Sequence, residues 1–478
     1  MRAEKKEVVI AGAGLPSLLL ALKIAEDHPQ NKILILEKNA ELGGMFRSFD
    51  YGEHGFFDHG MHIIYETCIP AIDDVIGSVL DKDQWIFLEG NRKDIAGIYY
   101  NNQLQKDTPY VDFRNLKLKN RLRYTGGFFY NLALTLKGEP SFDNAEEALR
   151  WRFGKLVSNE VFEPILRKLY SRNLTELAPF ATQLLAMNRI ALFDKKVMLK
   201  LMKSDAIRAR VAYPDQLNLP NFRPNNQRGL YPKKFGMFRV MNAIEKKLNK
   251  YGVKIQTSAD IKELQVEGKT LKSVHYVTRE SGAQTVSADH LYWGAGTPPL
   301  AMLLKMPTRA LKIDKNPPGR FVNLIFDTPP NMGELYYFYC FEPGFQTFRV
   351  TRYGNYCADA DEKGLYRVCI ELWPQNEEEA LKTQPLEVAL SELKKFGVIT
   401  DKHRLVFSAV EIQAAGFPLP TVGNISNHKI IRDFIVSQNI SNITPIGALA
   451  EEGVFFLKDV LIDTFAKAKL RGHIHESN

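Results

Sequence analysis

Apolar runs and their spacing predict a strand, a helix and a second strand at the start of the chain. Val8–Ala11 is a continuous apolar run, typical of a strand that is buried on both faces. A helix-like run follows it, and a second apolar strand, Ile33–Leu36, ends at the acid Glu37. The pattern is typical of the first half of a parallel nucleotide-binding sheet.

A glycine turn, Gly12-x-Gly14-x-x-Ser17, joins the first strand to the helix. Gly12 permits a tight turn, and Gly14 lets the backbone approach a pyrophosphate because no Cβ intervenes. The helix then directs its N-terminal N–H groups at that phosphate. Glu37 follows at the distance expected for an acid that accepts hydrogen bonds from a ribose diol. An ordinary strand–turn–helix is the alternative, and this context disfavours it.

Residues 143–210 carry helical patterns and few strand signals. Asp143 and Glu146 form a capping-box pattern at the start of the first helix. Further helices are predicted at Val161–Leu169 and Thr182–Met202. We therefore expect a helical layer separate from the nucleotide fold.

The middle of the chain combines a predicted linker with an amphipathic helix. Pro214–Pro224 is rich in proline and asparagine, which favours a linker. Beyond it, Val240, Ile244 and Leu248 recur at a spacing of four, and Gly252 is a plausible C-terminal stop.

The last third of the chain is expected to be rich in strands. Residues 318–412 contain several aromatic and β-branched runs, which predict an antiparallel sheet with one helix around Pro385–Phe396. A strand at Asn442–Ile446 and a helix at Lys458–Arg471 close the chain.

The elements together predict an α/β protein of two interleaved domains. A split Rossmann-type domain is expected from residues 1–70, 225–300 and 415–478. Residues 71–224 and 301–414 are expected to form a substrate domain, an antiparallel sheet plus the helical layer at 143–210. The length of 478 residues agrees, because it exceeds what a single core usually supports.

Cysteine and histidine usage gives no sign of a metal site. The four cysteines, Cys68, Cys340, Cys357 and Cys369, are scattered without a C-x-x-C pair, which argues against zinc and against a disulfide framework. A reducing, cytoplasmic setting is therefore expected. Three histidines, His54, His59 and His62, lack partners in a familiar ligand pattern, so we expect no metal.

The net charge of +8 is partly concentrated in a stretch without acids, residues 114–123. The stretch contains Arg114, Lys117, Lys119, Arg121 and Arg123. It is compatible with a solvated face, with attraction of an anionic substrate, or with peripheral contact with an acidic membrane. No nucleic-acid motif accompanies the charge, so we expect no nucleic-acid partner.

Several ordered segments carry a resemblance to a known superfamily. Beyond the glycine turn and Glu37 come Gly43-Gly44-x-x-Arg47-Ser48 and H-G-M-H-I-I-Y-E-T. The others are E-E-A-L-R-W-R-F-G-K-L, G-L-Y-P-K-K-F-G-M and P-I-G-A-L-A-E-E-G-V-F-F. Together they resemble the FAD-dependent amine-oxidase-like superfamily, the flavoproteins with two dinucleotide-binding motifs. Within it, the resemblance is nearest to the protoporphyrinogen-oxidase-like and UDP-galactopyranose-mutase-like group.

The resemblance implies bound FAD. The turn would hold the pyrophosphate, Glu37 the adenosine ribose, and the glycine doublet Gly43-Gly44 the ribityl side. The histidine loop, residues 59–62, would lie with Gly60–His62 near the flavin ring. The implied cofactor-binding residues are Gly12, Ala13, Gly14, Leu15, Pro16, Ser17, Glu37, Lys38, Gly43, Gly44, Met45, Gly60, Met61, His62, Ile261, Gly447, Ala448, Val454, Phe455, Phe456 and Leu457.

The chain departs from the mutase pattern near the implied flavin. Where the mutases carry G-R, this sequence has Gly447-Ala448, and their Y-x-Y becomes Val454-x-Phe456 or Gly453-x-Phe455. These departures count against mutase chemistry while leaving FAD binding intact.

The candidates for chemistry follow from the resemblance and from residue type. His62 is the candidate for proton transfer, and Arg349, Arg352 and Tyr353 are candidates for binding a small, anionic substrate. The alternatives are a histidine that is only hydrogen-bonded near the ring and arginines that are paired within a sheet.

Three functions are compatible with the sequence. The first is an FAD-dependent oxidoreductase that passes a hydride from substrate to flavin N5, acting on a sugar, a nucleotide sugar or an amine in surface-polysaccharide biosynthesis. The second is a UDP-galactopyranose-mutase-like isomerase, and the third is a non-catalytic flavin-binding scaffold.

Overall fold

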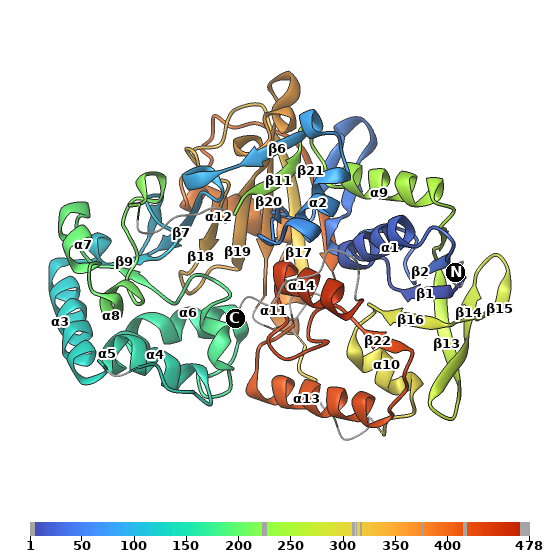
Figure 1. The fold of residues 1–478 in the computed structure, drawn as a ribbon. Coiled ribbons are helices and arrows are strands. Elements are labelled where there is room, and N and C mark those ends of the chain that lie inside the picture. The colour runs from blue at the N-terminus through green and yellow to red at the C-terminus, as the bar shows by residue number, and fades with distance from the viewer. Residues whose placement is uncertain are drawn as a thin grey trace. The chain divides into compact units, whose positions relative to one another are not determined.

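The chain forms two compact units in the computed structural model (Figure 1). The structure describes residues 5–136, 138–221, 227–307, 311, 313–315, 318–374, 376–413 and 418–468. Unit 1 comprises Met1–Phe87, Gln227–Lys312 and Ser426–Asn478, and unit 2 comprises Leu88–Asn226 and Ile313–Ile425.

These boundaries differ from the predicted ranges. Residues 71–87 and 301–312 belong by their contacts to unit 1, and residues 415–425 belong to unit 2. The first difference has a simple cause, because helix α2 (Pro70–Ser78) packs against α1 (Leu15–Asp27) and α14 (Leu457–Lys467). That each unit serves cofactor or substrate stays a prediction.

A five-stranded parallel sheet organises unit 1, in the order β12-β2-β1-β16-β22. Its strands are β1 (Glu7–Ala11), β2 (Lys32–Leu36), β12 (Lys254–Gln256), β16 (His290–Trp293) and β22 (Ile443–Pro445). The chain leaves β1 toward β2 on one side, whereas β16 pairs with β1 on the other. Such a switch point is where open parallel sheets bind ligands, beyond the carboxyl ends of their strands.

Helices and a second sheet cover the parallel sheet. Helix α1 packs on β1 and β2 and contacts α9 (Phe238–Lys250) and α14. Helix α9 buries its predicted apolar stripe, and Gly252 follows its end at φ +73°. An antiparallel sheet of β13 (Ala259–Glu267), β14 (Thr270–Thr278) and β15 (Gly282–Ser287) adds a core shared with Val9 and Trp293.

Smaller elements complete unit 1. They are β3 (Ser48–Asp50), β4 (Phe56–Asp58), β5 (Ile64–Tyr65), β6 (Trp85–Leu88), β11 (Gly229–Pro232), α10 (Thr297–Leu303) and α13 (Val422–Ser437). Strand β6 ends and helix α13 begins at residues assigned to unit 2. The predicted C-terminal helix is α14, and residues 469–471 of that prediction lie outside the described residues.

A seven-stranded sheet forms the centre of unit 2, in the order β21-β17-β20-β19-β18-β7-β8. Its strands are β7 (Ala96–Tyr100), β8 (Gln103–Gln105), β17 (Gly319–Phe326), β18 (Tyr337–Cys340), β19 (Thr347–Arg352), β20 (Tyr366–Leu372) and β21 (Leu405–Gln413). The sheet is antiparallel except where β18 pairs in parallel with β7. Helix α12 (Pro385–Lys395) is the predicted helix and packs on β17, β20 and β21.

The helical layer of unit 2 begins earlier than predicted. It contains α3 (Leu118–Leu134), α4 (Ala145–Phe153), α5 (Lys155–Val157), α6 (Glu163–Tyr170), α7 (Lys195–Leu201) and α8 (Asp205–Arg208), with a π-helical turn at Ser158–Phe162. Short strands β9 (Val111–Asp112) and β10 (Ile190–Ala191) pair beside them, and α11 (Glu377–Lys382) lies elsewhere in unit 2.

Two local predictions in this layer were wrong. The run Thr182–Met202 is not one helix, because turns and β10 precede α7. The N-cap of α4 is Asn144, whose side chain accepts a hydrogen bond from the N–H of Glu147, one residue later than the predicted box.

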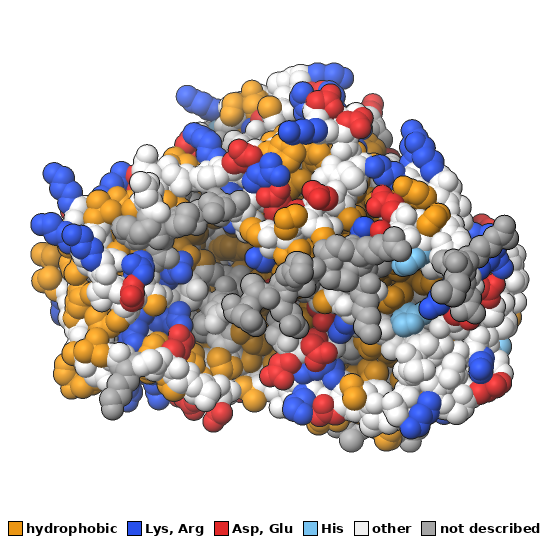
Figure 2. Space-filling model, in the orientation of Figure 1, with side chains coloured by type: hydrophobic (Ala, Val, Ile, Leu, Met, Phe, Trp, Pro, Cys, Tyr) orange, Lys and Arg blue, Asp and Glu red, His pale blue; other side chains and the backbone are white. Residues whose placement is uncertain are grey.

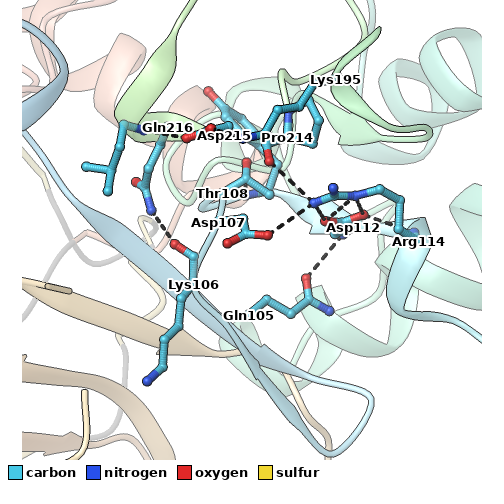
Figure 3. A network of polar contacts seen from close by, with 12 residues as sticks. Gln105, Lys106, Asp107, Thr108, Asp112, Arg114, Lys195, Pro214, Asp215 and Gln216 are labelled. Carbon is cyan, nitrogen blue, oxygen red and sulfur yellow. Dashed lines mark hydrogen bonds and ion pairs between the residues drawn. The ribbon is translucent and has the colours of Figure 1, made fainter. Parts of the chain in front are cut away.

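The predicted linker at Pro214–Pro224 is a packed segment over its described part (Figure 3). Gln216 donates Nε2–H groups to the carbonyls of Ala96 (2.8 Å) and Lys106 (2.6 Å), and its Oε1 accepts from the N–H of Ala96 at 3.0 Å. A proline-rich composition favoured a linker, but the glutamine amide satisfies strand-edge backbone groups and anchors the segment. Residues 222–226 lie outside the described residues.

Candidate cofactor site

Four strand ends meet at one edge of the parallel sheet of unit 1. Because the strands run parallel, the residues that follow β1, β2, β16 and β22 leave the sheet on the same side. They are the turn 12–14, Glu37, Gly294 and Gly447. The fold thus gathers segments that are more than 400 residues apart in the sequence.

The glycine turn has the backbone and the space that a phosphate cradle needs. Gly12 adopts φ +91°, and a Cβ there would lie 3.2 Å from the carbonyl carbon of Gly294. Gly14 is the N-cap of α1, no side chain caps this helix end, and a Cβ on Gly14 would meet only Pro16 at 3.9 Å. The uncapped helix end and the open approach fit an anion.

Ser17 preserves close packing at the third position of the motif. A Cβ on Gly294 would lie 2.5 Å from Ser17 Oγ, so helix α1 and the end of β16 touch with no room to spare. Serine is small enough for this contact, and the residue across from it is a glycine.

Glu37 is held at the end of β2 by three hydrogen bonds. Its Oε2 accepts from the N–H of Ala13 at 2.7 Å, and its Oε1 accepts from the N–H and Nδ2 of Asn39 at 2.8 Å. A carboxylate can accept about four hydrogen bonds, so capacity remains for a ribose hydroxyl. Lys38, by contrast, is exposed and lies 3.7 Å from Asp260.

The glycine doublet packs directly on the turn. The N–H of Gly43 donates to the carbonyl of Ala13 at 2.8 Å. Gly43 adopts φ +96°, and a Cβ there would lie 2.6 Å from Met241 Cγ on α9. Gly44 adopts φ +59° and faces Gly14. Two glycines are therefore needed here, because the backbone makes a left-handed turn packed between the turn 12–14 and α9.

The histidine loop lies beside the residues that follow the doublet. Gly60 adopts φ +74°, and the ring of the half-buried His62 meets Phe46 edge-on at 5.1 Å. His59 is buried and stacks on Phe49 at 3.9 Å. The structure thus brings His62 to the segment that the resemblance assigns to the flavin side.

Asp58 is a buried acid that the sequence did not single out, and it connects the segment 229–237 with the histidine loop. Its carboxylate accepts hydrogen bonds from Ser48 Oγ (2.5 Å), from the Tyr231 hydroxyl and from the N–H of Met237 (2.8 Å). Burial raises the pKa of Asp58 to about 6, against the opposing effect of these donors. The network attaches the segment 229–237 to the histidine loop.

Ile261, which the resemblance implies as a cofactor-binding residue, is on the strand that begins beside Glu37. The N–H of Ala259, the first residue of β13, donates to the carbonyl of Glu37 at 2.8 Å, and Ile261 follows two residues later. A register shift between Ile261 and Glu263 interrupts the pairing of β13 at this point.

The C-terminal segment of the site is a tight turn that leads into α14. Gly447 adopts φ +100°, and the N–H of Leu449 donates to the carbonyl of Val454 at 2.8 Å. Phe456 is the N-cap of α14, and its N–H donates to Asp459 at 3.2 Å. The predicted residues 447–457 thus surround the start of a helix in unit 1.

Two of the three predicted substrate residues, Arg349 and Arg352, are on β19 of the seven-stranded sheet, and Tyr353 begins the 3-10 turn that follows this strand. Arg349 is inside unit 2 and forks onto Glu371, with Nε 2.6 Å from Oε1 and Nη2 3.1 Å from Oε2. Burial alone would lower the pKa of Arg349, but the charge of Glu371 raises it, whereas burial raises the pKa of Glu371. The two-point contact has the geometry of an ion pair.

Arg352 and Tyr353 are also engaged inside unit 2. Arg352 is buried and pairs with Asp361, with Nη1 2.6 Å from Oδ1, and Tyr353 is fully buried. Arg349 and Arg352 are three residues apart on one strand, so their side chains point to opposite faces of the sheet. A substrate role for these residues stays a prediction.

Known proteins share this fold. Residues 10–75 match the family profile described as an NAD(P)-binding Rossmann-like domain. A reduced UDP-galactopyranose mutase superimposes with a TM-score of 0.71 at 16% identity, covering 97% of this chain and 96% of that one. The chain therefore shares its fold with this solved structure over nearly its whole length. No curated protein shows significant sequence similarity to it.

Two further solved structures agree. A protein proposed to be a protoporphyrinogen oxidase, from Exiguobacterium sp. 255-15, gives a TM-score of 0.66 at 17% identity, covering 97% of this chain and 98% of that one. An oxidoreductase from Methanosarcina mazei gives 0.59 at 12% identity, covering 97% and 100%. The predicted fold class and resemblance are confirmed at the level of the fold.

Proposed function

We propose that unit 1 binds FAD and that the protein is an FAD-dependent oxidoreductase. The observation that carries the proposal is the convergence of Gly12, Gly14, Glu37 and the doublet at one sheet edge, with an uncapped helix end at their centre. Bound FAD supplies an N5 atom that accepts a hydride from the substrate. The fold shared with known flavoproteins supports FAD over a nicotinamide dinucleotide.

Each part of the site has a defined task in this proposal. The turn and the end of α1 bind and orient the pyrophosphate, and Glu37 accepts the ribose hydroxyls. His62 is the group that holds or moves a proton on its imidazole, since it borders the segment after the doublet. Asp58 is a positioning residue, because it fixes the loop that carries His62.

We propose a sugar, a nucleotide-linked sugar or an amine as the substrate, in surface-polysaccharide biosynthesis. The support is the similarity to a structure named for UDP-galactopyranose. The departures Gly447-Ala448 and Val454–Phe456 favour oxidation over the mutase reaction, because side chains that the mutases carry there are replaced.

The test is spectroscopic. The purified protein should carry a flavin absorbance band, and anaerobic mixing with amines and nucleotide sugars should bleach it for the true substrate. A protein that stays colourless after reconstitution would overturn the cofactor proposal. Turnover only after chemical reduction, without net electron consumption, would identify an isomerase, and bound flavin that no compound bleaches would favour a scaffold.

A single acid tests the cofactor geometry. We expect Glu37→Ala to weaken FAD binding about ten- to a hundredfold, because a charged hydrogen-bond acceptor contributes about 1.5–3 kcal/mol. Fluorescence titration of the apoprotein with FAD measures this. Glu26→Ala is the matched control, because Glu26 is an exposed acid on α1. Equal affinity of the two variants would contradict the assignment of Glu37.

A further inference from the structure

One face of the helical layer in unit 2 exposes large apolar side chains. Among the described residues, seven large apolar side chains are more than 60% exposed, and five of them lie in or just after α3. These five are Leu118 (68%), Leu122 (65%), Tyr130 (72%), Leu134 (68%) and Leu136 (67%). Helix α7 adds Val197 and Leu199, at 43% and 39%. Figure 2 shows hydrophobic side chains along the edge formed by α3.

Helix α3 is apolar on two opposite faces. Tyr124, Phe128 and Leu132 recur at a spacing of four and are buried in the core of unit 2. Leu122, Tyr130 and Leu134 lie on the other side of the same helix, facing outward. A helix that buries one apolar stripe and exposes a second needs another apolar surface, since isolated patches of this kind are uncommon on monomers.

Unpaired cations surround the exposed stripe. Within the described residues, six lysines and arginines on or next to α3 and α7 form no ion pair. They are Lys117, Lys119, Arg121, Lys196, Lys200 and Lys203. The remaining arginines of the basic stretch are neutralised, Arg114 by Asp112 and Arg123 by Glu160. Of the five cations in residues 114–123, two are therefore paired, and three keep a charge near the apolar stripe that is unpaired within the described part of the chain.

Exposed apolar side chains next to unpaired positive charges favour an anionic bilayer over a second copy of the chain as the partner. A second copy of the chain would bring six like charges against six, and lysine is depleted in protein–protein interfaces. An anionic bilayer accepts leucine and tyrosine side chains at its interface and attracts the flanking lysines and arginines. None of the described helices is long and apolar enough to cross a bilayer, so contact would be in the membrane plane.

Polar contacts hold the N-terminal ends of α3 and α7 in place (Figure 3). Arg114, four residues before α3, forks onto Asp112 and also lies 3.5 Å from Asp107. Lys195, the first residue of α7, pairs with Asp215, which caps the turn 216–218. The apolar stripe is thus presented by a preformed scaffold rather than by a segment that must fold on contact.

We propose that the face formed by α3 and α7 docks on the surface of an anionic phospholipid bilayer. Helix α3, 17 residues and about 25 Å long, lies parallel to the membrane with its outward stripe among the acyl chains. The proposal is independent of the cofactor and adds a location to the proposed oxidoreductase.

Vesicle flotation with the full-length protein tests the proposal. Phosphatidylcholine vesicles with about 30% phosphatidylglycerol should bind at low ionic strength at least tenfold more strongly than pure phosphatidylcholine vesicles, and raised salt should release the protein. We expect Leu122→Ser/Leu134→Ser to reduce binding more than tenfold, and each of Lys119→Gln and Lys200→Gln to reduce it roughly fivefold.

Matched controls keep the experiment decisive. Val436→Ser removes an apolar side chain that is 76% exposed on α13, and it should leave binding unchanged, as should Lys250→Gln on α9. Circular dichroism should be the same for all variants, since every substituted side chain is exposed. Absence of binding to anionic vesicles would overturn the proposal. So would light scattering that shows a dimer abolished by Leu122→Ser/Leu134→Ser, because the face would then join two copies.

Discussion

Charged side chains have different partners at the carboxyl ends of the parallel strands of unit 1 and in the seven-stranded sheet of unit 2. At the edge, Glu37 is held by backbone and amide donors and keeps acceptor capacity, and no described residue of opposite charge pairs with it. In unit 2, Arg349 and Arg352 are each forked onto a carboxylate inside the fold. Glu37 therefore keeps hydrogen-bonding capacity, whereas the two arginines of the sheet are already paired within unit 2.

The buried lysine of unit 2 follows the same rule. Lys168 donates from Nζ to the carbonyls of Thr347 (2.7 Å) and Cys340, and burial lowers its pKa. It joins the end of β18 to the start of β19. An unusual titratable group thus marks a structural joint here, so an altered pKa alone does not locate an active site.

We expect the largest loss of stability when the ion pair between Arg349 and Glu371 is broken. We expect Glu371→Ala to lower the free energy of unfolding by about 3–5 kcal/mol, because it leaves the Arg349 charge buried without a partner. The double variant Arg349→Met/Glu371→Leu should recover most of this loss. Urea unfolding measures both. A loss below about 1 kcal/mol for Glu371→Ala would contradict the expectation that the Arg349 charge depends on this one partner.

The next effect concerns pH and Asp58. Its folded pKa of about 6 lies above the ordinary 3.8, so the native state keeps a proton that the unfolded state has lost between these values. Its contribution is therefore complete below about pH 4 and is lost as pH rises through 6, by up to about 3 kcal/mol.

Asp58→Asn isolates this contribution. The amide oxygen still accepts from the N–H of Met237, but the side chain does not titrate. The stability difference between variant and parent should grow in favour of the variant from pH 4 to pH 7. The difference, rather than either curve, is the measurement, because His290, whose pKa burial lowers to about 4, titrates in the same range in both proteins. A constant difference would show that Asp58 is ionised throughout.

The smallest effect tests the glycine doublet. We expect Gly43→Ala to cost about 2–3 kcal/mol of stability, from its positive φ and from the contact with Met241, and to weaken FAD binding. Gly52→Ala is the control, because Gly52 has a φ of +60° but open space around it, and it should cost only about 1 kcal/mol. Thermal unfolding compares them. Equal costs would mean that Met241 moves away and that the doublet is not pressed on the turn.

The sequence predicted the parts of the fold that depend on backbone geometry. The turn at Gly12 and Gly14 and the acid at Glu37 are recognisable because a phosphate and a ribose require those residue types at those positions. The helix at 238–250 was predictable because only one of its faces is apolar. These features are local, so neighbouring residues are sufficient to define them.

The rest depends on contacts between distant segments. Asp58 looks like an ordinary acid in the sequence, and only the fold places Ser48, Tyr231 and Met237 around it. Helix α3 was missed because its apolar residues occupy two faces, which hides the usual one-sided period. Residues Thr182–Met202 have helical composition, yet pairing with β9 draws β10 out of that run.

The exposure of the cysteines differs between the two units, so that their reaction with a thiol reagent would report the opening of unit 2. Cys68 is exposed in unit 1, whereas Cys340, Cys357 and Cys369 are all buried in unit 2. A thiol reagent should therefore modify one site rapidly in the native protein and the other three only when unit 2 opens. The kinetics of labelling would follow the opening of unit 2, and the fluorescence of the FAD that we propose for unit 1 would follow the other unit, without any introduced probe.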